Sequence, residues 1–293
     1  TKAAAVANTP FSDGEVAGVV ASLQGVVGAG DVDWAALEEL LRASAHQPHK
    51  DWARTKKAAE KLSQILGGPD DAFFRGMFKR VLEDGNWDGA AFAQLVGKPW
   101  VVLVCGVNGI RKTTSIYQPW YKDVLYEALG GQVPKEELPV GANSFFRQLD
   151  YMIATMANEE FAKLYMIDEV GMYAARKDSI FARYRTVAEM LGGLLCMAAA
   201  ERGLNVMVET SGRDVAMFDY IDHFFPDDQY RKLAVNFVIN DVAFAERSVD
   251  ARMLGEMAAG RAAVESGRPE HVIEANAGGP YGSQVLRGVQ ADS

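Results

Sequence analysis

The sequence predicts an α/β fold: a mostly parallel sheet with helices on both faces, preceded by an all-helical N-terminal region. Three observations lead to this prediction. Residues 1–95 show helical periodicity and no strand pattern. Trp100–Cys105 is then continuously apolar, as expected for a strand that is buried on both faces. Beyond it, candidate strands alternate with helical patterns, which is typical of parallel strands joined by crossover helices.

Apolar stripes at helical spacing, separated by turns rich in glycine and proline, define the N-terminal helices. They cover residues 15–27, 34–43, 52–66 and 73–82. Asp33 stands where it would cap the second of these helices. The pattern changes at Pro99, so we predict a helical domain over residues 1–97 and an α/β domain over residues 98–293.

The remaining elements of the α/β region follow from the same criteria. Long helical patterns cover Thr114–Leu129 and run from Phe145 to about Arg202. Further strands are expected at Leu138–Ala142, Asn205–Val208 and Leu233–Ile239, with a last one at His271–Glu274 or Ser283–Leu286.

The charge balance excludes a broad nucleic-acid-binding surface. The 293 residues include 30 Lys and Arg against 39 Asp and Glu, which gives a formal net charge of −9. Binding to a polyanion needs clustered positive charge. A single local basic pocket for a small phosphorylated ligand stays compatible with this composition.

Cysteine content and hydropathy bear on the compartment. Cys105 and Cys196 lie far apart in apolar segments, so they form neither a disulfide framework nor a zinc ligand set. A reducing, intracellular compartment is therefore expected, either the cytoplasm or an organelle interior. No apolar run reaches about 18 residues, so no membrane span is expected. The first residue is Thr1 rather than Met, as it would be after removal of a targeting segment.

The strongest motif begins where the first strand ends. Gly106-Val-Asn-Gly-Ile-Arg-Lys-Thr113 fits Gly-x-x-x-x-Gly-Lys-Thr, except that Arg111 replaces the second glycine. In such a phosphate loop, backbone N–H groups surround the β-phosphate of a nucleotide and Lys112 reaches the β- and γ-phosphates. Thr113 would offer its hydroxyl to Mg²⁺. An ordinary glycine-rich turn is the alternative. The expected nucleotide-binding residues are Gly106, Asn108, Gly109, Ile110, Arg111, Lys112, Thr113 and Thr114.

A second set of polar residues follows the strand at Asn205–Val208. It consists of Glu209, Thr210, Ser211 and Arg213. Because the carboxyl ends of neighbouring parallel strands share one crevice, these side chains are expected beside the phosphate loop. Glu209 would hold Mg²⁺ through water or accept a hydrogen bond from a substrate hydroxyl, and Arg213 would pair with a phosphate. A capped turn with a solvent-exposed ion pair is the alternative.

Arginines of the last long helical pattern are the third component. Arg247 and Arg252 lie in this pattern, and Arg261 follows. Phosphoryl-transfer enzymes place arginines over the transferring group, where they neutralise developing charge. Ordinary surface positions on a helix are the alternative for each of them.

Four segments carry a family resemblance: Gly106–Thr113, Asn143–Gln148, Phe161–Tyr165 and Asn205–Arg213. In this order they resemble the motifs of zeta-toxin-type P-loop kinases, over roughly residues 98–255. The resemblance implies an ATP- or GTP-dependent phosphotransferase that acts, with Mg²⁺, on a small hydroxyl-bearing acceptor. It places Lys112 and Thr113 on the nucleotide and the metal, and Glu209, Ser211 and Arg213 in the acceptor pocket, while the helix arginines approach the phosphates.

Two departures from the family pattern bear on catalysis, and Arg111 is one of them. The family has an aspartate near the end of the second strand as base for the acceptor hydroxyl, where this chain reads Asn143-Ser144. Neither residue is a competent base at neutral pH. Asp150 lies further along the expected helix, and Glu209 would act as base if Asp150 is out of reach. The departures leave open a nucleotide-binding regulatory module with lost or attenuated catalysis, which would meet a protein partner through its N-terminal helices.

Two other interpretations also stay open. The phosphate loop, Ala142–Arg147 and Glu209–Arg213 resemble degraded motifs of signal-recognition-particle GTPases, although Ile239-Asn-Asp-Val does not match the guanine-reading segment of that family. Asp168-Glu169 resembles the acidic strand end of an ATPase, with Asp168 on Mg²⁺ and Glu169 as base. Phe161–Met172 nevertheless has helical spacing and is predicted to be helix.

Overall fold

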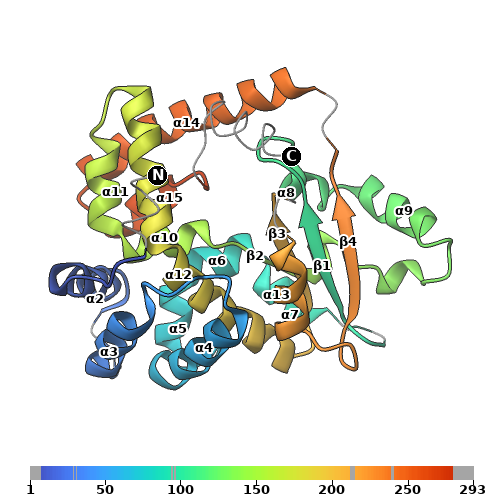
Figure 1. Ribbon diagram of the computed structural model, residues 1–293. Coiled ribbons are helices and arrows are strands. Elements are labelled where there is room, and N and C mark those ends of the chain that lie inside the picture. Colours follow the sequence, from blue (N-terminus) through green and yellow to red (C-terminus); the bar gives the residue numbers. More distant parts are fainter. Residues whose placement is uncertain are drawn as a thin grey trace.

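A four-stranded, all-parallel sheet lies at the heart of the α/β region (Figure 1). The computed structural model describes residues 8–28, 30, 32–93, 95, 97–211, 215–238 and 241–279. The strands are β1 Trp100–Cys105, β2 Ser144–Arg147, β3 Asn205–Thr210 and β4 Arg231–Asn236. They are ordered β2-β3-β1-β4, so the predicted α/β class is confirmed and the first strand has its predicted bounds.

Six helices precede the sheet within the described residues, as the apolar stripes predict. Side-chain caps fix where several of them begin. The Asp33 carboxylate accepts a hydrogen bond from the Ala36 N–H at 3.0 Å, and Asp51 caps the next helix in the same way through Arg54. The helices are α2 Asp13–Val27, α3 Trp34–Ser44, α4 Trp52–Leu66, α5 Ala72–Met77, α6 Lys79–Asp84 and α7 Trp87–Phe92.

The remaining helices connect and cover the strands. Figure 1 shows the long α12 on the side of the sheet where the N-terminal helices lie, and α9 projecting beyond β4. Among the described residues, no helix has both the length and the apolar character needed to cross a bilayer. The helices are α8 Lys112–Ser115, α9 Pro119–Ala128, α10 Asp150–Met156, α11 Asn158–Tyr165, α12 Val170–Glu201, α13 Ala216–Phe224, α14 Val242–Glu265 and α15 Pro269–Ala275.

Alternate side chains of β1 enter two different cores, because successive residues of a strand point to opposite faces. Val101 and Leu103 lie in a large core with α12, α13 and the N-terminal helices. Trp100 and Val102 lie in a smaller core with α9. Burying a large apolar side chain stabilises a fold by about 1.5–3 kcal/mol, so the two cores hold helices against both faces of the sheet. The N-terminal helices thus share a core with the sheet, and the boundary near residue 97 stays a prediction.

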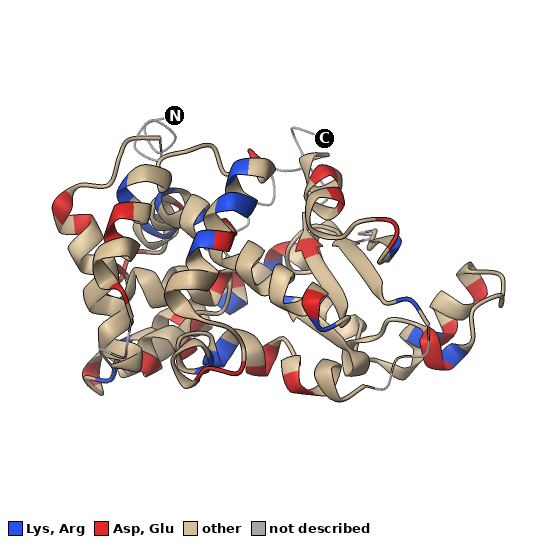
Figure 2. Cartoon of the chain, turned by 90° about the horizontal axis from the view of Figure 1, so that it is seen from below, with Lys and Arg blue, Asp and Glu red and all other residues tan. Residues whose placement is uncertain are grey.

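Charged residues are mixed over the helices rather than separated into a basic and an acidic side (Figure 2). This distribution agrees with the expectation from the net charge of −9 that the surface is not broadly basic. Any concentration of positive charge therefore has to be local.

The strand expected at Leu138–Ala142 is wrong. This segment is irregular, and β2 begins only at Ser144. Pro139 has no N–H to donate to a strand ladder. The Val140 N–H is bonded to the Asn143 side chain at 2.9 Å instead of to a neighbouring strand.

Proline also breaks the helix expected over Thr114–Leu129. The first part, α8, ends at Ser115, and α9 begins at Pro119. A residue that precedes proline is disfavoured in the helical region, and Gln118 is accordingly extended, with ψ 143°. The helix that follows the loop after β1 is therefore a single turn.

Three further expectations are corrected. Phe145 lies in β2, so the helical part that was expected to begin there starts at Asp150 instead. Residues 166–169 separate α11 from α12, so Phe161–Met172 is neither one helix nor a strand, and Asp168-Glu169 ends no strand. His271–Glu274 belongs to helix α15, whose first residue is a proline. The alternative strand at 283–286 lies outside the described residues, as does Ile239 beyond β4.

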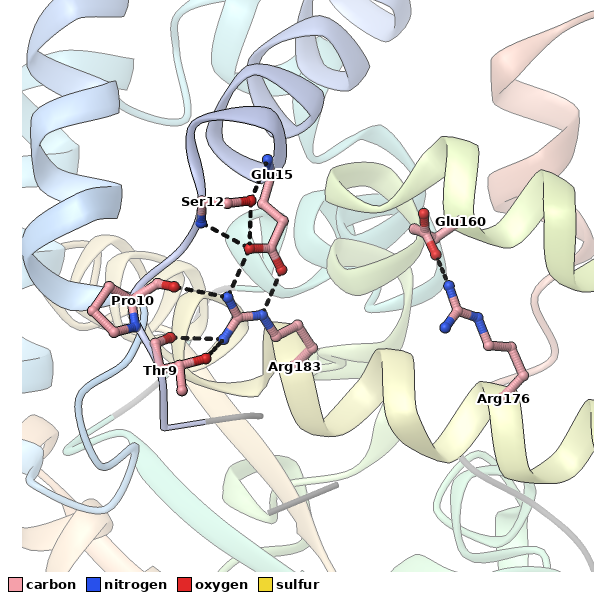
Figure 3. A network of polar contacts seen from close by, with 7 residues as sticks. All are labelled: Thr9, Pro10, Ser12, Glu15, Glu160, Arg176 and Arg183. Carbon is pink, nitrogen blue, oxygen red and sulfur yellow. Dashed lines mark hydrogen bonds and ion pairs between the residues drawn. The ribbon is translucent and has the colours of Figure 1, made fainter. Parts of the chain in front are cut away.

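Arg183 of α12 holds the N-terminal segment against the rest of the chain (Figure 3). Its guanidinium donates to both carboxylate oxygens of Glu15, at 2.7 and 2.8 Å. It also donates to the backbone carbonyls of Thr9 and Pro10, at 2.7 and 3.1 Å. Hydrogen bonding to Arg183 lowers the pKa of Glu15 to about 2. A second α12 arginine, Arg176, pairs with Glu160 and is half exposed.

The two arginines give a matched test of this anchor. Arg183→Ala should lower the free energy of unfolding by about 2 kcal/mol. This is less than the loss expected on breaking a fully buried ion pair, because the Glu15 side chain is 33% exposed. Arg176→Ala should cost no more than about 0.5 kcal/mol, as an exposed pair does. Urea unfolding of both variants at pH 7 measures the difference, and equal losses would contradict the assignment.

The same pair predicts a pH dependence. A carboxylate whose pKa is lowered in the fold stabilises it above its ordinary pKa of 4.5, and this contribution disappears as the pH falls towards about 2. The difference between the wild type and Arg183→Ala should therefore shrink between these two pH values.

Candidate functional site

A cavity of about 700 Å³ lies where β1, β2 and β3 end. It is lined by the loop after β1, by residues 147–151 at and beyond the end of β2, and by residues 209–211 at the end of β3. The beginning of α4, the middle of α12, Arg252 of α14 and residues 277–279 complete its wall. Crevices at the carboxyl ends of parallel strands are the usual ligand sites of open α/β sheets.

The loop after β1 has a backbone that needs glycine at two positions. Gly106 has φ 144° and Gly109 has φ 87°, in the region that side chains disfavour. A Cβ on Gly109 would also lie 2.8 Å from the Ala245 carbonyl oxygen and from Val249 Cγ1 of α14. Glycine at this position therefore lets the loop pack directly beneath α14.

Arg111 occupies a third left-handed position of the same loop, with φ 63° and ψ 33°. The second glycine of the phosphate-loop motif would stand here, and glycine adopts this conformation without a Cβ penalty. The Arg111 side chain is exposed and its guanidinium lies 5.4 Å from the centre of the Phe244 ring. The chain thus keeps a glycine-like conformation although it carries an arginine.

Lys112 is buried at the centre of the loop, with 4% of its surface exposed. Its Nζ donates to the carbonyl oxygens of Gly106 and Val107, at 2.6 and 3.0 Å. It also lies 3.0 Å from Glu209 Oε1. The ammonium group is therefore fixed between the loop backbone and the end of β3.

Strand register brings Glu209 to the loop. In the β1–β3 pair, Val104 lies opposite Glu209 and Cys105 opposite Thr210. The pairing continues one step further, since the Gly106 N–H donates to the Thr210 carbonyl oxygen at 3.1 Å. Glu209, Thr210 and Ser211 all line the cavity, beside the loop as the sequence predicts.

Asp150 also lines the cavity, although a long helix starting at Phe145 would have carried it away. Because β2 continues to Arg147, Asp150 lies only three residues beyond the end of the strand, as the first residue of α10. Burial, and then the charge of Glu209, raise the pKa of its carboxyl group to about 6. The cavity therefore contains a carboxyl group, that of Asp150, whose pKa lies close to neutral pH.

Asn143 and Ser144, which stand where the family pattern has its base, lie at the opposite end of β2 from Asp150. The Asn143 side chain accepts from the Val140 N–H at 2.9 Å and donates to the Leu138 carbonyl oxygen at 3.0 Å. Ser144 is fully buried. Both residues have structural roles, and the carboxyl group at the carboxyl end of β2 is that of Asp150.

Only some of the arginines that were predicted to approach the phosphates line the cavity in the described residues. Arg252 lines the cavity, whereas Arg247 does not; its side chain is 69% exposed and lies 3.9 Å from Asp241. Arg261 pairs with Asp168 on the surface, away from the cavity lining. Arg213 lies outside the described residues.

Asn108, Thr113 and Thr114 line the cavity, and Ile110 does not. The Ile110 side chain packs against the loop itself, 2.8 Å from where a Cβ on Gly106 would lie. Glu169, the base of the ATPase interpretation, caps α12 by accepting from the N–H groups of Gly171 and Met172.

Sequence patterns missed the residues at the other end of the cavity. His49 and Lys50 line it from the turn just before α4, together with Arg147 of β2 and Arg185 and Glu189 of α12. Only two of these five gave a local signal: Arg147 ends an apolar strand, and Glu189 interrupts the apolar stretch of α12. Nothing in the spacing along the chain relates the five positions to one another.

The C-terminal segment was missed as well. Glu256 of α14, 2% exposed, accepts from Lys177 Nζ at 2.6 Å, from the Tyr173 hydroxyl at 2.6 Å and from the Ala277 N–H at 2.9 Å. The Asn276 side chain donates to the Asp150 carbonyl oxygen at 2.9 Å. These contacts hold residues 276–279 across the cavity, next to Asp150.

No family model, curated protein or solved structure matches this chain. The resemblance to zeta-toxin-type kinases, and the weaker one to signal-recognition-particle GTPases, therefore stay hypotheses. Asn240, part of the segment compared with a guanine-reading motif, lies outside the described residues. The function has to be inferred from the residues that line the cavity.

Substitution of Arg111 tests the backbone strain in the loop. Arg111→Gly should be more stable than Arg111→Ala by about 1 kcal/mol, because both lose the contact with Phe244 and only alanine keeps the left-handed penalty. Thermal or urea unfolding of the two variants measures this. An alanine variant as stable as the glycine variant would show that Arg111 does not have a left-handed backbone.

The raised pKa of Asp150 predicts how the stability of the protein changes with pH. A carboxyl group with a raised pKa favours the fold while it is protonated, so its ionisation destabilises the protein as the pH rises from 3.8 through about 6. Asp150→Asn should therefore be more stable than the wild type at pH 7, by about 1–3 kcal/mol, and equally stable near pH 4. Asp228→Asn, at an exposed carboxyl group outside the cavity lining, is the control and should follow the wild-type profile.

Proposed function

We propose that this chain is a nucleotide-dependent phosphotransferase that moves a phosphoryl group to a small hydroxyl-bearing acceptor. One observation carries the proposal: Lys112 of the phosphate loop and Asp150, a carboxyl group with a pKa of about 6, line the same cavity. A lysine in such a loop binds phosphates, and a carboxylate with this pKa is a suitable base near neutral pH. A nucleotide-binding module without catalysis has no need of the second group.

The residues present fit a nucleotide with Mg²⁺. The loop has the glycines, the left-handed turn and the central lysine that cradle phosphates, and the Thr113 side chain lies at the cavity. Among the described residues, no group of three His, Cys, Asp or Glu side chains could hold a metal ion. Mg²⁺ is commonly bound by one or two protein ligands together with substrate phosphates and water. Thr113 and Glu209 would be those ligands, and the ion would neutralise phosphate charge.

Asp150 is the base in this proposal. It would accept the proton of the acceptor hydroxyl while the hydroxyl oxygen forms the new bond to phosphorus and the bond to the nucleoside diphosphate breaks. Glu209 would orient the acceptor and fix Lys112, with which it is already paired at 3.0 Å. Arg252 would stabilise charge on the transferring group from the α14 side of the cavity.

The second candidate is a nucleotide-binding module with attenuated catalysis, as the departures in the sequence suggest. The pairing of Lys112 with Glu209 favours it, because an incoming phosphate has to compete with a carboxylate for the ammonium group. The left-handed backbone of Arg111 adds strain to the same loop. In this case a nucleotide would bind without turnover, and the N-terminal helices would contact a protein partner.

Nucleotide binding is tested by calorimetric titration and by the melting temperature in the presence of ATP or GTP with Mg²⁺. We expect the wild type to be stabilised and Lys112→Ala to lose at least about tenfold in affinity, since a charged hydrogen bond contributes about 1.5–3 kcal/mol. Lys57→Ala, at an exposed lysine of α4 outside the cavity, is the control. If neither nucleotide binds, or if Lys112→Ala binds as well as the wild type, the phosphate-loop assignment is wrong.

Turnover distinguishes the two candidates. ADP or GDP release is measured with sugar, nucleoside and nucleotide-sugar acceptors, in the wild type and in Asp150→Asn. A general base contributes about 10²–10⁴-fold to the rate. The kcat of Asp150→Asn should therefore be lower than that of the wild type by a factor of this size, while its nucleotide affinity is unchanged. Nucleotide binding without turnover on any acceptor would favour the regulatory module.

A further inference from the structure

Two arginines and one buried glutamate meet at the end of the cavity away from the phosphate loop. Arg147 Nη1 lies 2.9 Å from Glu189 Oε2, and Arg185 Nη2 lies 2.6 Å from Glu189 Oε1. Glu189 is fully buried and Arg147 is 3% exposed, whereas the Arg185 side chain is 38% exposed. Although burial opposes its ionisation, the two arginines hold the pKa of Glu189 below its ordinary value.

One carboxylate, that of Glu189, is thus shared by two guanidinium groups. The Arg147 Nη1 also donates to the Tyr220 hydroxyl at 2.8 Å, while its buried Nε has no hydrogen-bond partner among the residues that the structure describes. Of the two guanidinium groups, that of Arg185 is the one that an anion in the cavity can contact directly, because its side chain is 38% exposed.

The N-terminal helices complete this end of the cavity. His49 and Lys50, just before α4, line it together with Arg147 and Arg185. The backbone around them is fixed: the Thr186 hydroxyl donates to the Gln47 carbonyl oxygen at 2.8 Å. The Trp52 indole N–H similarly donates to the Ala216 carbonyl oxygen at 2.7 Å. A cationic wall is therefore built from segments that lie far apart in the chain.

The strand register separates this cluster from the phosphate loop. Arg147 pairs with Val208 of β3, and Val208 pairs with Leu103 of β1, so Arg147 lies two strands away from the strand that carries the loop. Neighbouring strands are about 4.8 Å apart, which puts the two strand ends roughly 10 Å from each other. Glu209 belongs to β3, the strand between them, and Asp150 lies three residues beyond Arg147; both line the cavity.

We propose that Arg147, Arg185, Lys50 and His49 form a second anion subsite, which binds a phosphate group carried by the acceptor. Its role in the reaction rests on the proposed function, whereas its existence as a binding site does not. A guanidinium group matches two oxygens of a phosphate ester, and an acceptor bound through its phosphate at one end would present a hydroxyl to Asp150. The N-terminal helices then determine which acceptors enter.

The subsite is tested in the 293-residue chain with Lys112→Ala, which weakens competition for anions by the loop after β1. Inorganic phosphate and glycerol 3-phosphate are the probes, glycerol is the uncharged control, and affinities are measured by calorimetric titration. Both phosphates should bind and glycerol should not. Adding Arg185→Ala or Lys50→Ala should weaken both phosphates at least about tenfold, as expected for the loss of a charged contact. Adding Lys57→Ala should change neither.

Each outcome decides the proposal. If the Lys112→Ala protein binds neither phosphate, or if Arg185→Ala and Lys50→Ala leave the affinity unchanged, the subsite does not exist. Binding of inorganic phosphate without glycerol 3-phosphate would overturn the acceptor role. If the wild type fails to bind ATP or GTP while the subsite behaves as expected, the proposed phosphotransferase is wrong and the anion site stands. If Arg185→Ala disturbs the fold, Lys50→Ala still tests the subsite, because Lys50 is exposed and its substitution leaves no buried charge without a partner.

Discussion

The position of β1 between β3 and β4 is the constraint on which the cavity depends. Its six residues are buried on both faces and paired on both edges, so the loop that follows cannot shift without breaking two ladders. The β3 register places Glu209 opposite Val104. Lys112 is then fixed between that carboxylate and the carbonyl oxygens of its own loop. A slip of one residue would turn Glu209 to the other face of the sheet.

Helix α12 links the three parts of the chain through buried or partly buried charges. Arg183 anchors the N-terminal segment, Glu189 gathers the arginines of the cavity, and Lys177 pairs with Glu256, which holds the C-terminal segment. A buried ion pair adds little net stability against an apolar alternative, but leaving one partner alone is costly. Such pairs therefore fix how segments are arranged, and one of these groups, Glu189 with Arg147 and Arg185, lines the cavity of a protein whose net charge is −9.

Where local chemistry dominates, the sequence was sufficient for prediction. The six apolar residues of β1 could only be a strand buried on both sides, and Asp33 capped its helix as predicted. Prediction failed where a single residue redirected an apolar segment. Pro139 removed a donor from an expected strand, and Pro119 broke an expected helix. The segment at Phe145 has an apolar pattern that suits either element, and only its pairing with β3 made it a strand.

The sequence by itself determined the class of the fold, the position of the glycine-containing loop after β1 and the nearness of Glu209 to it, because each follows from neighbours in the chain or from the rule that parallel strands end together. Only the tertiary structure decided that Asp150 reaches the cavity. It also decided that Arg147 meets Arg185 and that Lys50 of the N-terminal helices faces the same space. These contacts join positions far apart in the chain, and their free energy comes from shared burial and charge, which no local pattern encodes.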